Sequence, residues 1–329
     1  MISPGTNLGI WRSCKGPNGQ KNPARPAFRI APALEQNWFP FVEAQRFADS
    51  EAKALVALLD DPSPAVRKAL RERFARNGSE SLDLLQDLAR QPDSALAKHA
   101  SQFLRELNFT DPVAEFRDFI RSLNYELETG ALLLSRTVNP AVDVAACCLL
   151  LDAMAARCRE LIAEPATARE KCRVLNRVLF HEYSLHGNAE NYRDPLNSFL
   201  DQVLIRRKGI PISLSIVYLL VAERIGLQLE PVGLPGHFLV GCYEESAPFF
   251  VDPFNAGLLL GAEEVFELVK QSLPSASILD LAPTPVREVL TRCCRNLVNH
   301  YTDGNQTAQA RLFEGFVAEF ESTHERHSS

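Results

Sequence analysis

The feature that most constrains this fold is a nearly continuous apolar stretch at residues 212–221. Wound as a helix, it carries apolar side chains on every face, which is typical of a buried helix. Gly209 suits the left-handed residue after a helix ending at Lys208, and Pro211 suits the first position of a new helix. The stretch meets a charge at Glu223, so it is too short to span a bilayer. The sequence therefore predicts a buried central helix.

Two β-prone segments follow, residues 237–243 and 249–252, joined by the polar loop 244–248. Pairing centred on that loop sets His237 nearly opposite Asp252, with Cβ atoms about 4.5–5.5 Å apart. At that distance a carboxylate can orient an imidazole. A nucleophile at the start of the preceding helix would complete a triad of the Cys-His-Asp type.

Several motifs in this region resemble one family. They are Gly-Ile-Pro-Ile-Ser-Leu-Ser at 209–215, Leu-Pro-Gly-His-Phe-Leu-Val at 234–240, Val-Asp-Pro-Phe-Asn at 251–255, and the polar segment 188–204 before them. Together they resemble the SirB-like branch of the transglutaminase-like superfamily, over residues 111–269. The resemblance implies an α+β fold that is mostly α, with a papain-like core and a small antiparallel sheet, flanked by helical repeats.

The resemblance also implies a triad of Cys, His and Asp, which this chain matches only in part. His237 and Asp252 stand where the family has them, but no cysteine stands at the helix start. Ser213 is the hydroxyl in the first turn. A serine is not activated by a helix N-terminus as a thiol is, and it needs a base and an oxyanion hole. Ser213 is therefore either a nucleophile or a residue that satisfies a free backbone N–H, and the His–Asp pair is either catalytic or structural.

A polar loop precedes the helix that leads to Gly209. Its side chains Asn191, Tyr192, Asp194 and Asn197 are candidates for lining a cleft beside the triad. Asn and Asp also cap backbone groups in turns, so a purely structural role is equally open.

The rest of the chain divides by pattern into further segments. Residues 1–45 are rich in Pro and in positive charge, which predicts a flexible basic tail. Residues 46–108 show helical stripes, and the turn at 58–67 resembles a HEAT repeat. The transglutaminase-like domain is expected at 109–282. A helical hairpin at 283–329 resembles the start of a tetratricopeptide-type extension.

The first stripe of the HEAT-like region comprises Leu55, Leu58 and Leu59, which follow helical spacing and are expected to face a common core. Two repeats rarely fold alone, so we expect this region to dock on the next domain. Repeat surfaces usually bind partners, although a structural cap is an equal alternative.

Composition narrows the function classes. The net charge of −6 argues against nucleic-acid binding, and no apolar run of membrane-spanning length or signal-peptide core is present. The 8 cysteines are scattered without metal-ligand spacing, which predicts reduced thiols in a cytoplasmic protein with no metal or cofactor.

Two function classes remain open. The leading hypothesis is a non-catalytic interaction or regulatory module that binds a protein partner. The alternative is a serine-variant acyl-transfer or peptide-bond hydrolase using Ser213, His237 and Asp252.

Overall fold

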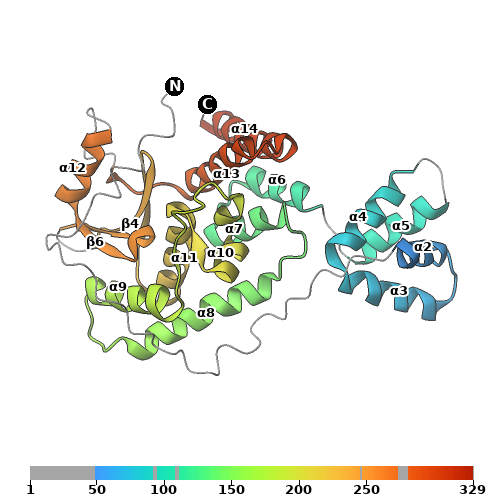
Figure 1. Cartoon of the computed structure of the whole chain (residues 1–329), viewed down its shortest axis with the longest axis horizontal. Helices are drawn as coiled ribbons and strands as arrows, with labels where there is room; N and C mark the ends of the chain where they lie inside the picture. Colours follow the sequence, from blue (N-terminus) through green and yellow to red (C-terminus); the bar gives the residue numbers. More distant parts are fainter. Residues whose placement is uncertain (1–48, 92–94, 108–110, 245–246, 273–280, 329) are drawn as a thin grey trace. The chain divides into compact units, whose positions relative to one another are not determined.

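The computed structural model describes residues 49–91, 95–107, 111–244, 247–272 and 281–328 (Figure 1). Among these, residues 49–118 and 135–142 form one compact unit, and residues 119–134 and 143–328 form a larger one. The predicted basic tail at 1–45 lies outside the described residues. The described chain is mostly helical with a small antiparallel sheet, which confirms the predicted α+β class.

The smaller unit contains two helical pairs. Their helices are α2 (Asp49–Ala57), α3 (Pro64–Arg76), α4 (Gly78–Ala89) and α5 (Ala95–Glu106). Leucines and the rings of Phe74 and Phe103, which meet edge to face, form the core between them. The prediction for Leu58 was wrong, because this side chain is 42% exposed. Helix α2 ends at Ala57, so Leu58 lies in the following turn and points away from the core.

The remaining helices mostly build the larger unit. They are α6 (Pro112–Ser122), α7 (Leu127–Arg136), α8 (Val144–Leu161), α9 (Ala168–Asn176), α10 (Leu200–Arg206), α11 (Pro211–Arg224), α12 (Ala262–Ser272), α13 (Val286–Asp303) and α14 (Thr307–Ser328). Shorter turns are η2 (Arg177–Glu182), which is π-helical and continues α9, and the 3-10 turns η3 (Pro195–Ser198) and η4 (Pro253–Asn255).

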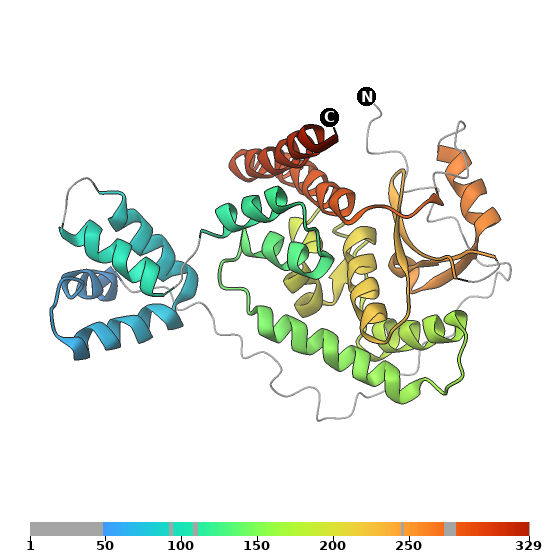
Figure 2. The ribbon, with the colours of Figure 1, turned by 180° about the vertical axis from the view of Figure 1, so that it is seen from behind.

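Helix α11 is the centre of the larger unit, where it packs against strand β4 and helices α8 and α10 (Figure 2). Every residue from Pro211 to Ala222 is buried, which confirms the predicted central helix. Pro211 occupies the first turn as expected, and the chain turns at Gly226 with φ of 70°. Among the described residues no helix is long and apolar enough to cross a membrane.

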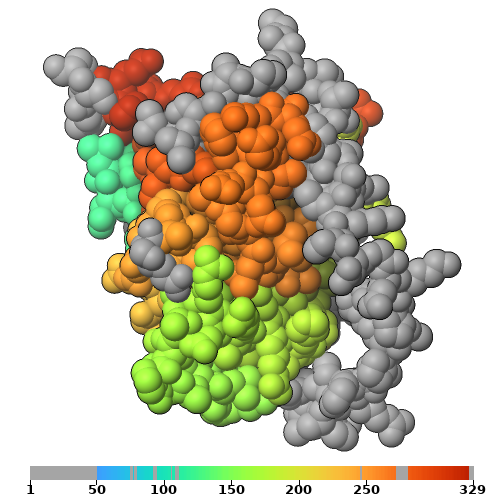
Figure 3. Space-filling view, turned by 90° about the vertical axis from the view of Figure 1, so that its left-hand side faces the viewer, coloured from blue at the N-terminus to red at the C-terminus, as the bar shows by residue number. Residues whose placement is uncertain are grey.

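The antiparallel sheet has the strand order β3-β4-β5-β6. Its strands are β3 (Glu230–Leu234), β4 (His237–Cys242), β5 (Phe249–Asp252) and β6 (Leu258–Gly261). A two-residue turn joins β3 to β4, and Gly236 takes a φ of 71° there, which glycine adopts without steric cost. Leu239 and Phe250 pack in one cluster with Val265 and Val269 of α12. Figure 3 shows the outer surface of α12, in orange, above the yellow-green α9.

A second, two-stranded sheet pairs β1 (His186–Gly187) in parallel with β2 (Lys208–Gly209). The chain enters each strand through a residue with positive φ, Ser184 at 58° and Arg207 at 57°. The expectation that Gly209 is the left-handed residue after the helix was therefore wrong. Helix α10 ends two residues early, at Arg206, because residues 208 and 209 are needed to pair with β1.

The C-terminal segment forms the antiparallel pair α13–α14. Its core includes Phe313, Phe316 and Phe320 of α14, all fully buried, and the Phe313 ring stacks on Tyr301 of α13. A helical hairpin is thus present in the predicted region.

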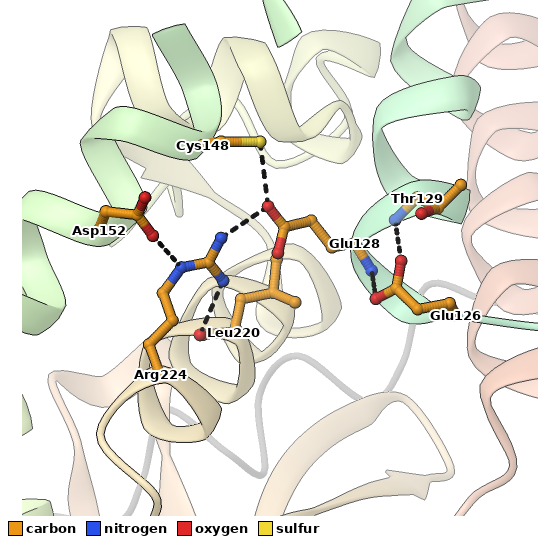
Figure 4. Close-up of polar contacts among 7 residues, drawn as sticks. All are labelled: Glu126, Glu128, Thr129, Cys148, Asp152, Leu220 and Arg224. Atoms are coloured by element: carbon orange, nitrogen blue, oxygen red, sulfur yellow. Dashed lines mark hydrogen bonds and ion pairs between the residues drawn. The ribbon is translucent and has the colours of Figure 1, made fainter. Parts of the chain in front are cut away.

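An ion-pair cluster joins the C-terminal turn of α11 to α7 and α8 (Figure 4). The Arg224 guanidinium donates to Glu128 at 2.7 Å and to Asp152 at 2.7 Å. It also donates to the carbonyl oxygen of Leu220, while the thiol of Cys148 donates to the same Glu128 carboxylate at 3.2 Å. Because the Arg224 and Glu128 side chains are only 17% and 18% exposed, loss of either partner would leave a partly buried charge unpaired, which is unfavourable.

Candidate functional site

His237 and Asp252 lie on adjacent antiparallel strands, at the start of β4 and the end of β5. Nε2 of His237 is 2.8 Å from Oδ2 of Asp252, which confirms the predicted contact. The strands pair Val240 with Val251, however, so Asp252 lies diagonally across from His237 and not nearly opposite it as predicted. The two side chains are only 3% and 1% exposed. The pair therefore lies beneath the surface, and a substrate reaches it only if a covering side chain moves.

Asp252 is held by more than the histidine. It caps η4: its Oδ1 accepts hydrogen bonds from the backbone N–H of Phe254 at 3.1 Å and of Asn255 at 3.2 Å. Its Oδ2 accepts a further bond from the Asn255 side-chain amide at 2.7 Å. The short Asp-Pro-Phe-Asn sequence thus builds a turn that fixes the carboxylate before it meets the imidazole. Four donors satisfy Asp252, so the carboxylate is stable here without any substrate.

Two residues that contact His237 were not predicted from the sequence to belong to the site. The Phe254 ring meets the imidazole edge to face, with ring centroids 6.2 Å apart. Arg292 of α13 donates from one terminal nitrogen to the carbonyl oxygens of His237 at 2.8 Å and Leu234 at 2.6 Å. Phe254 stands inside a quoted motif, but Arg292 lies far along the chain in an ordinary amphipathic helix. No local signal marks Arg292.

Ser213 stands in the first turn of α11, and its hydrogen bonds go to backbone groups. Its Oγ accepts from the N–H of Ile210 at 3.0 Å and donates toward the carbonyl oxygen of Asn197 at 2.6 Å. It is 2% exposed. The described structure thus brings His237 and Asp252 together but gives Ser213 no hydrogen bond to either.

The four loop residues proposed for the cleft lie in the polar segment between β1 and α10. Asp194 caps η3 and forms an ion pair with Arg206. Asn197 is fully buried and bonds to the carbonyl oxygens of Asn191 and Tyr192. The Asp194 cap and the Asn197 amide bonds thus satisfy backbone groups, and the ion pair joins the loop to α10.

Tyr192 differs from the other loop residues. Its ring lies edge-on to Phe254 and to His300, with centroids 6.0 and 6.2 Å away. Tyr192 and Phe254 are both half-buried, and Phe254 contacts the His237 ring. Phe254 therefore contacts both the imidazole and Tyr192 of the polar loop.

Comparisons with known proteins show the family to which this chain is similar. Residues 145–295 match the model of the transglutaminase-like superfamily, which supports the papain-like core. A UPF0162 protein of Xylella fastidiosa is 36% identical over 192 residues, which cover 56% of this chain and 68% of the relative. The chain belongs to the UPF0162 protein family.

Further relatives share shorter regions. A UPF0162 protein of Vibrio cholerae is 29% identical over 135 residues, covering 41% of this chain and 50% of the relative. The human F-box only protein 21 is 36% identical over 133 residues, covering 38% of this chain but only 21% of its own length. No solved structure matches the chain.

In this UPF0162 family member, the hydrogen bonds of the Ser213 hydroxyl limit nucleophilic chemistry at the site. Nε2 of His237 is engaged by Asp252, so a nucleophile would have to use the other ring nitrogen. Ser213 is the hydroxyl predicted for that role, and its proton is directed at a carbonyl oxygen. Among the described residues, no group of three or more His, Cys, Asp or Glu side chains is arranged to hold a metal ion.

Proposed function

We propose that this chain is a transglutaminase-like binding domain that recognises a protein partner and does not catalyse acyl transfer. The observation that carries the proposal is the hydrogen bonding of Ser213. Its oxygen accepts from Ile210 and its proton faces Asn197, both at backbone atoms. A hydroxyl held in this way serves the helix start, as serine commonly does in a first turn.

The energetics point the same way. To attack a carbonyl carbon, Ser213 would have to leave two buried backbone partners and reach an imidazole. Each orphaned buried group costs about 1–3 kcal/mol, before any barrier to the chemistry itself. A thiol could meet this demand as a thiolate stabilised by the helix N-terminus, but a serine hydroxyl is not ionised by that means. Burial of His237 and Asp252 adds the cost of opening the site.

The relatives support a binding role. The shared region forms most of a UPF0162 protein but about a fifth of F-box only protein 21. The same domain thus occurs in chains of very different construction, which is typical of a module. The HEAT-like and tetratricopeptide-like character proposed for the flanking helices adds surfaces of the kind that usually bind other proteins.

We place the protein in the cytoplasm as part of this proposal. Cys148 and the neighbouring pair Cys293 and Cys294 are free thiols. Free thiols are usual in a reducing compartment. If these cysteines are found oxidised when the protein is isolated from cells, the result would argue against a cytoplasmic location.

The serine-variant hydrolase remains a second candidate because of one contact. The 2.8 Å bond from Asp252 to Nε2 is the orientation that a catalytic histidine needs. In that mechanism Ser213 would attack an acyl carbon, and His237 would take the hydroxyl proton and then pass it to the leaving group.

A serine-directed fluorophosphonate probe separates the two candidates. The purified protein, Ser213→Ala and His237→Gln are each treated and mapped by mass spectrometry. We expect no adduct on Ser213 in the native protein or in His237→Gln, and Ser213→Ala reports any labelling at other residues. An adduct on Ser213 that disappears in His237→Gln would overturn the proposal and establish the hydrolase.

The proposed recognition of a protein partner is tested separately, by cross-linking in cells. The native chain and Ser213→Ala are cross-linked, and the attached proteins are identified. A binding domain yields the same cross-linked partner from both chains, because the hydroxyl has no part in recognition. No reproducible partner from either chain would contradict it.

A further inference from the structure

We infer that a groove on the smaller unit binds the chain's own segment 38–42, Trp-Phe-Pro-Phe-Val, which precedes α2 in the sequence. The inference goes beyond the proposed function, because it concerns a surface of the smaller unit and names the occupant of that surface. A groove filled in this way is closed to other proteins, so partner recognition would fall to other surfaces of the chain.

The groove has a volume of about 480 Å³ and is formed by three helices of the smaller unit. Its apolar lining comprises Ala52, Val56 and Ala57 of α2, Leu84 of α4 and Leu96 of α5. The two charged lining residues, Lys53 and Asp60, are exposed, so their charges can stay in water when an apolar group binds between the helices.

The groove continues the core of the smaller unit toward the surface. Val56, Leu84 and Leu96 are only half-buried, and each packs against the fully buried core residues of this unit. Covering these three side chains would remove more apolar surface from water, which is favourable. The volume falls within the range of about 300–1,000 Å³ that is usual for pockets enclosing small organic groups. The groove therefore has room for aromatic side chains.

The segment 38–42 differs in composition from the basic tail that precedes it. The basic residues of that tail end at Arg29, and Glu35 is the only charged residue from position 30 to position 42. Four of the five residues at 38–42 are large and apolar, and three of them are aromatic. Segments that stay in solvent usually contain few aromatic residues, whereas buried aromatic side chains contribute strongly to packing. This composition favours burial against an apolar surface.

The length of chain before α2 allows the segment to reach the groove. Residues 43–48 link it to Asp49, the first residue of α2. Six extended residues span roughly 20 Å, whereas the nine residues of α2 rise about 13 Å along the helix axis. The segment can therefore fold back along α2 without full extension of the link.

The short link also decides which occupant the groove has. A group joined to its site by a short flexible link has an effective concentration on the order of millimolar. A separate protein would have to compete with that concentration. The position of this apolar segment in the chain thus favours it over a partner or a second copy.

Pro40 at the centre of the segment suits such binding. Proline lacks a backbone N–H and biases the residue before it toward extended conformations. In an extended segment the side chains at positions 39 and 41 project from the same face. Phe39 and Phe41 can then enter the groove together.

Photo-cross-linking of the full chain tests this placement. The amino acid p-benzoylphenylalanine replaces Phe41, an equal mixture of ¹⁵N-labelled and unlabelled chains is irradiated, and the linked peptides are mapped by mass spectrometry. We expect cross-links within one chain, to residues 52–57, 84 or 96. Cross-links between labelled and unlabelled chains would assign the groove to a second copy and overturn the inference. Cross-links only to other regions, or none, would also overturn it.

Tryptophan fluorescence gives an independent measurement. The chain has two tryptophans, so Trp11→Phe leaves Trp38 as the only one. In this background, Ala57→Arg places a large charged side chain in the groove at an exposed position, so the core is left intact. The matched control is Ala54→Arg, at an exposed alanine of the same helix outside the described lining of the groove.

We expect Ala57→Arg to shift the Trp38 emission to longer wavelength and to increase its quenching by acrylamide, because the ring is displaced into water. Ala54→Arg should leave both unchanged. Equal emission and quenching in all three chains, or equal changes in both arginine variants, would overturn the inference. Neither measurement involves Ser213, so the outcome here is independent of the proposed function.

Discussion

Asp252→Asn is the change that most sharply tests whether the His–Asp pair is structural. The carboxylate accepts four hydrogen bonds, and asparagine retains Oδ1, so the two backbone caps to Phe254 and Asn255 survive. An NH₂ group replaces Oδ2, which faces His237 Nε2 and the Asn255 amide. The His237 Nε2–H and the Asn255 side-chain amide, which are both donors, then face the NH₂ group of the new side chain, which is also a donor.

The magnitude follows from burial. Asn255 is exposed, so its amide can turn to water at little cost. His237 has 3% of its side chain exposed and cannot do so, and an unsatisfied buried donor costs about 1–3 kcal/mol. Moving the imidazole proton to Nδ1 recovers part of this, because Nε2 then accepts from the new amide. We expect a loss of about 2 kcal/mol in the free energy of unfolding.

Asp194→Asn is the matched control, because Asp194 also caps a 3-10 turn that begins with proline. Its side chain is 27% exposed and its ion pair with Arg206 lies near the surface, so the loss should stay below about 1 kcal/mol. The assay is urea unfolding followed by circular dichroism, with the m-value compared between variants. If Asp252→Asn costs no more than Asp194→Asn, or stabilises the protein, the pair is not structural. Stabilisation on substitution is a mark of residues kept for activity, so the hydrolase would gain support.

Three further changes test the packing around the site. Leu219→Ala should cost about 2–5 kcal/mol in urea melts, against less than about 1 kcal/mol for the 40% exposed Leu258→Ala; equal losses would mean that α11 is not central. Arg224→Met should cost about 2 kcal/mol because it strands the partly buried Glu128, whereas Arg157→Met, at a 39% exposed side chain, should cost below about 1 kcal/mol. The pKa of the Cys148 thiol is raised to about 11, mainly by burial and then by Glu128. Iodoacetamide should therefore alkylate it at pH 8 far more slowly than a free cysteine. Quantitative mass spectrometry measures the two rates, and equal rates would contradict the prediction.

The parts of the fold that sequence predicted are those encoded by local pattern. Helix α11 follows from apolar residues on every face, and the meeting of His237 with Asp252 follows from the loop that centres their hairpin. The prediction for Leu58 failed because the spacing of leucines does not show where the helix ends. The expectation for Gly209 failed because the left-handed position falls at Arg207, where the chain turns so that β2 can pair with β1, a strand distant in sequence.

The candidate site divides in the same way. His237 and Asp252 were identified from their motifs, but the bond from Ser213 to Asn197 joins residues 16 positions apart across a loop of unpredictable path. Arg292 is 55 positions from His237, and only tertiary packing brings α13 against the β3–β4 turn. Side chains that act through backbone carbonyl oxygens leave no residue-type pattern at their targets, so sequence reasoning has no means to find them.

The same contacts explain why a histidine and an aspartate can persist without a nucleophile. Asp252 closes the turn after β5 with two backbone bonds, so its carboxylate is needed there whatever else it contacts. Once buried at 1% exposure, its second oxygen requires donors, and His237 supplies one of them. Removing the histidine would leave that oxygen with one bond fewer in a site closed to water, which is unfavourable for any buried charge. Hydrogen-bond satisfaction alone therefore suffices to hold the pair, and the presence of the pair does not by itself establish catalysis.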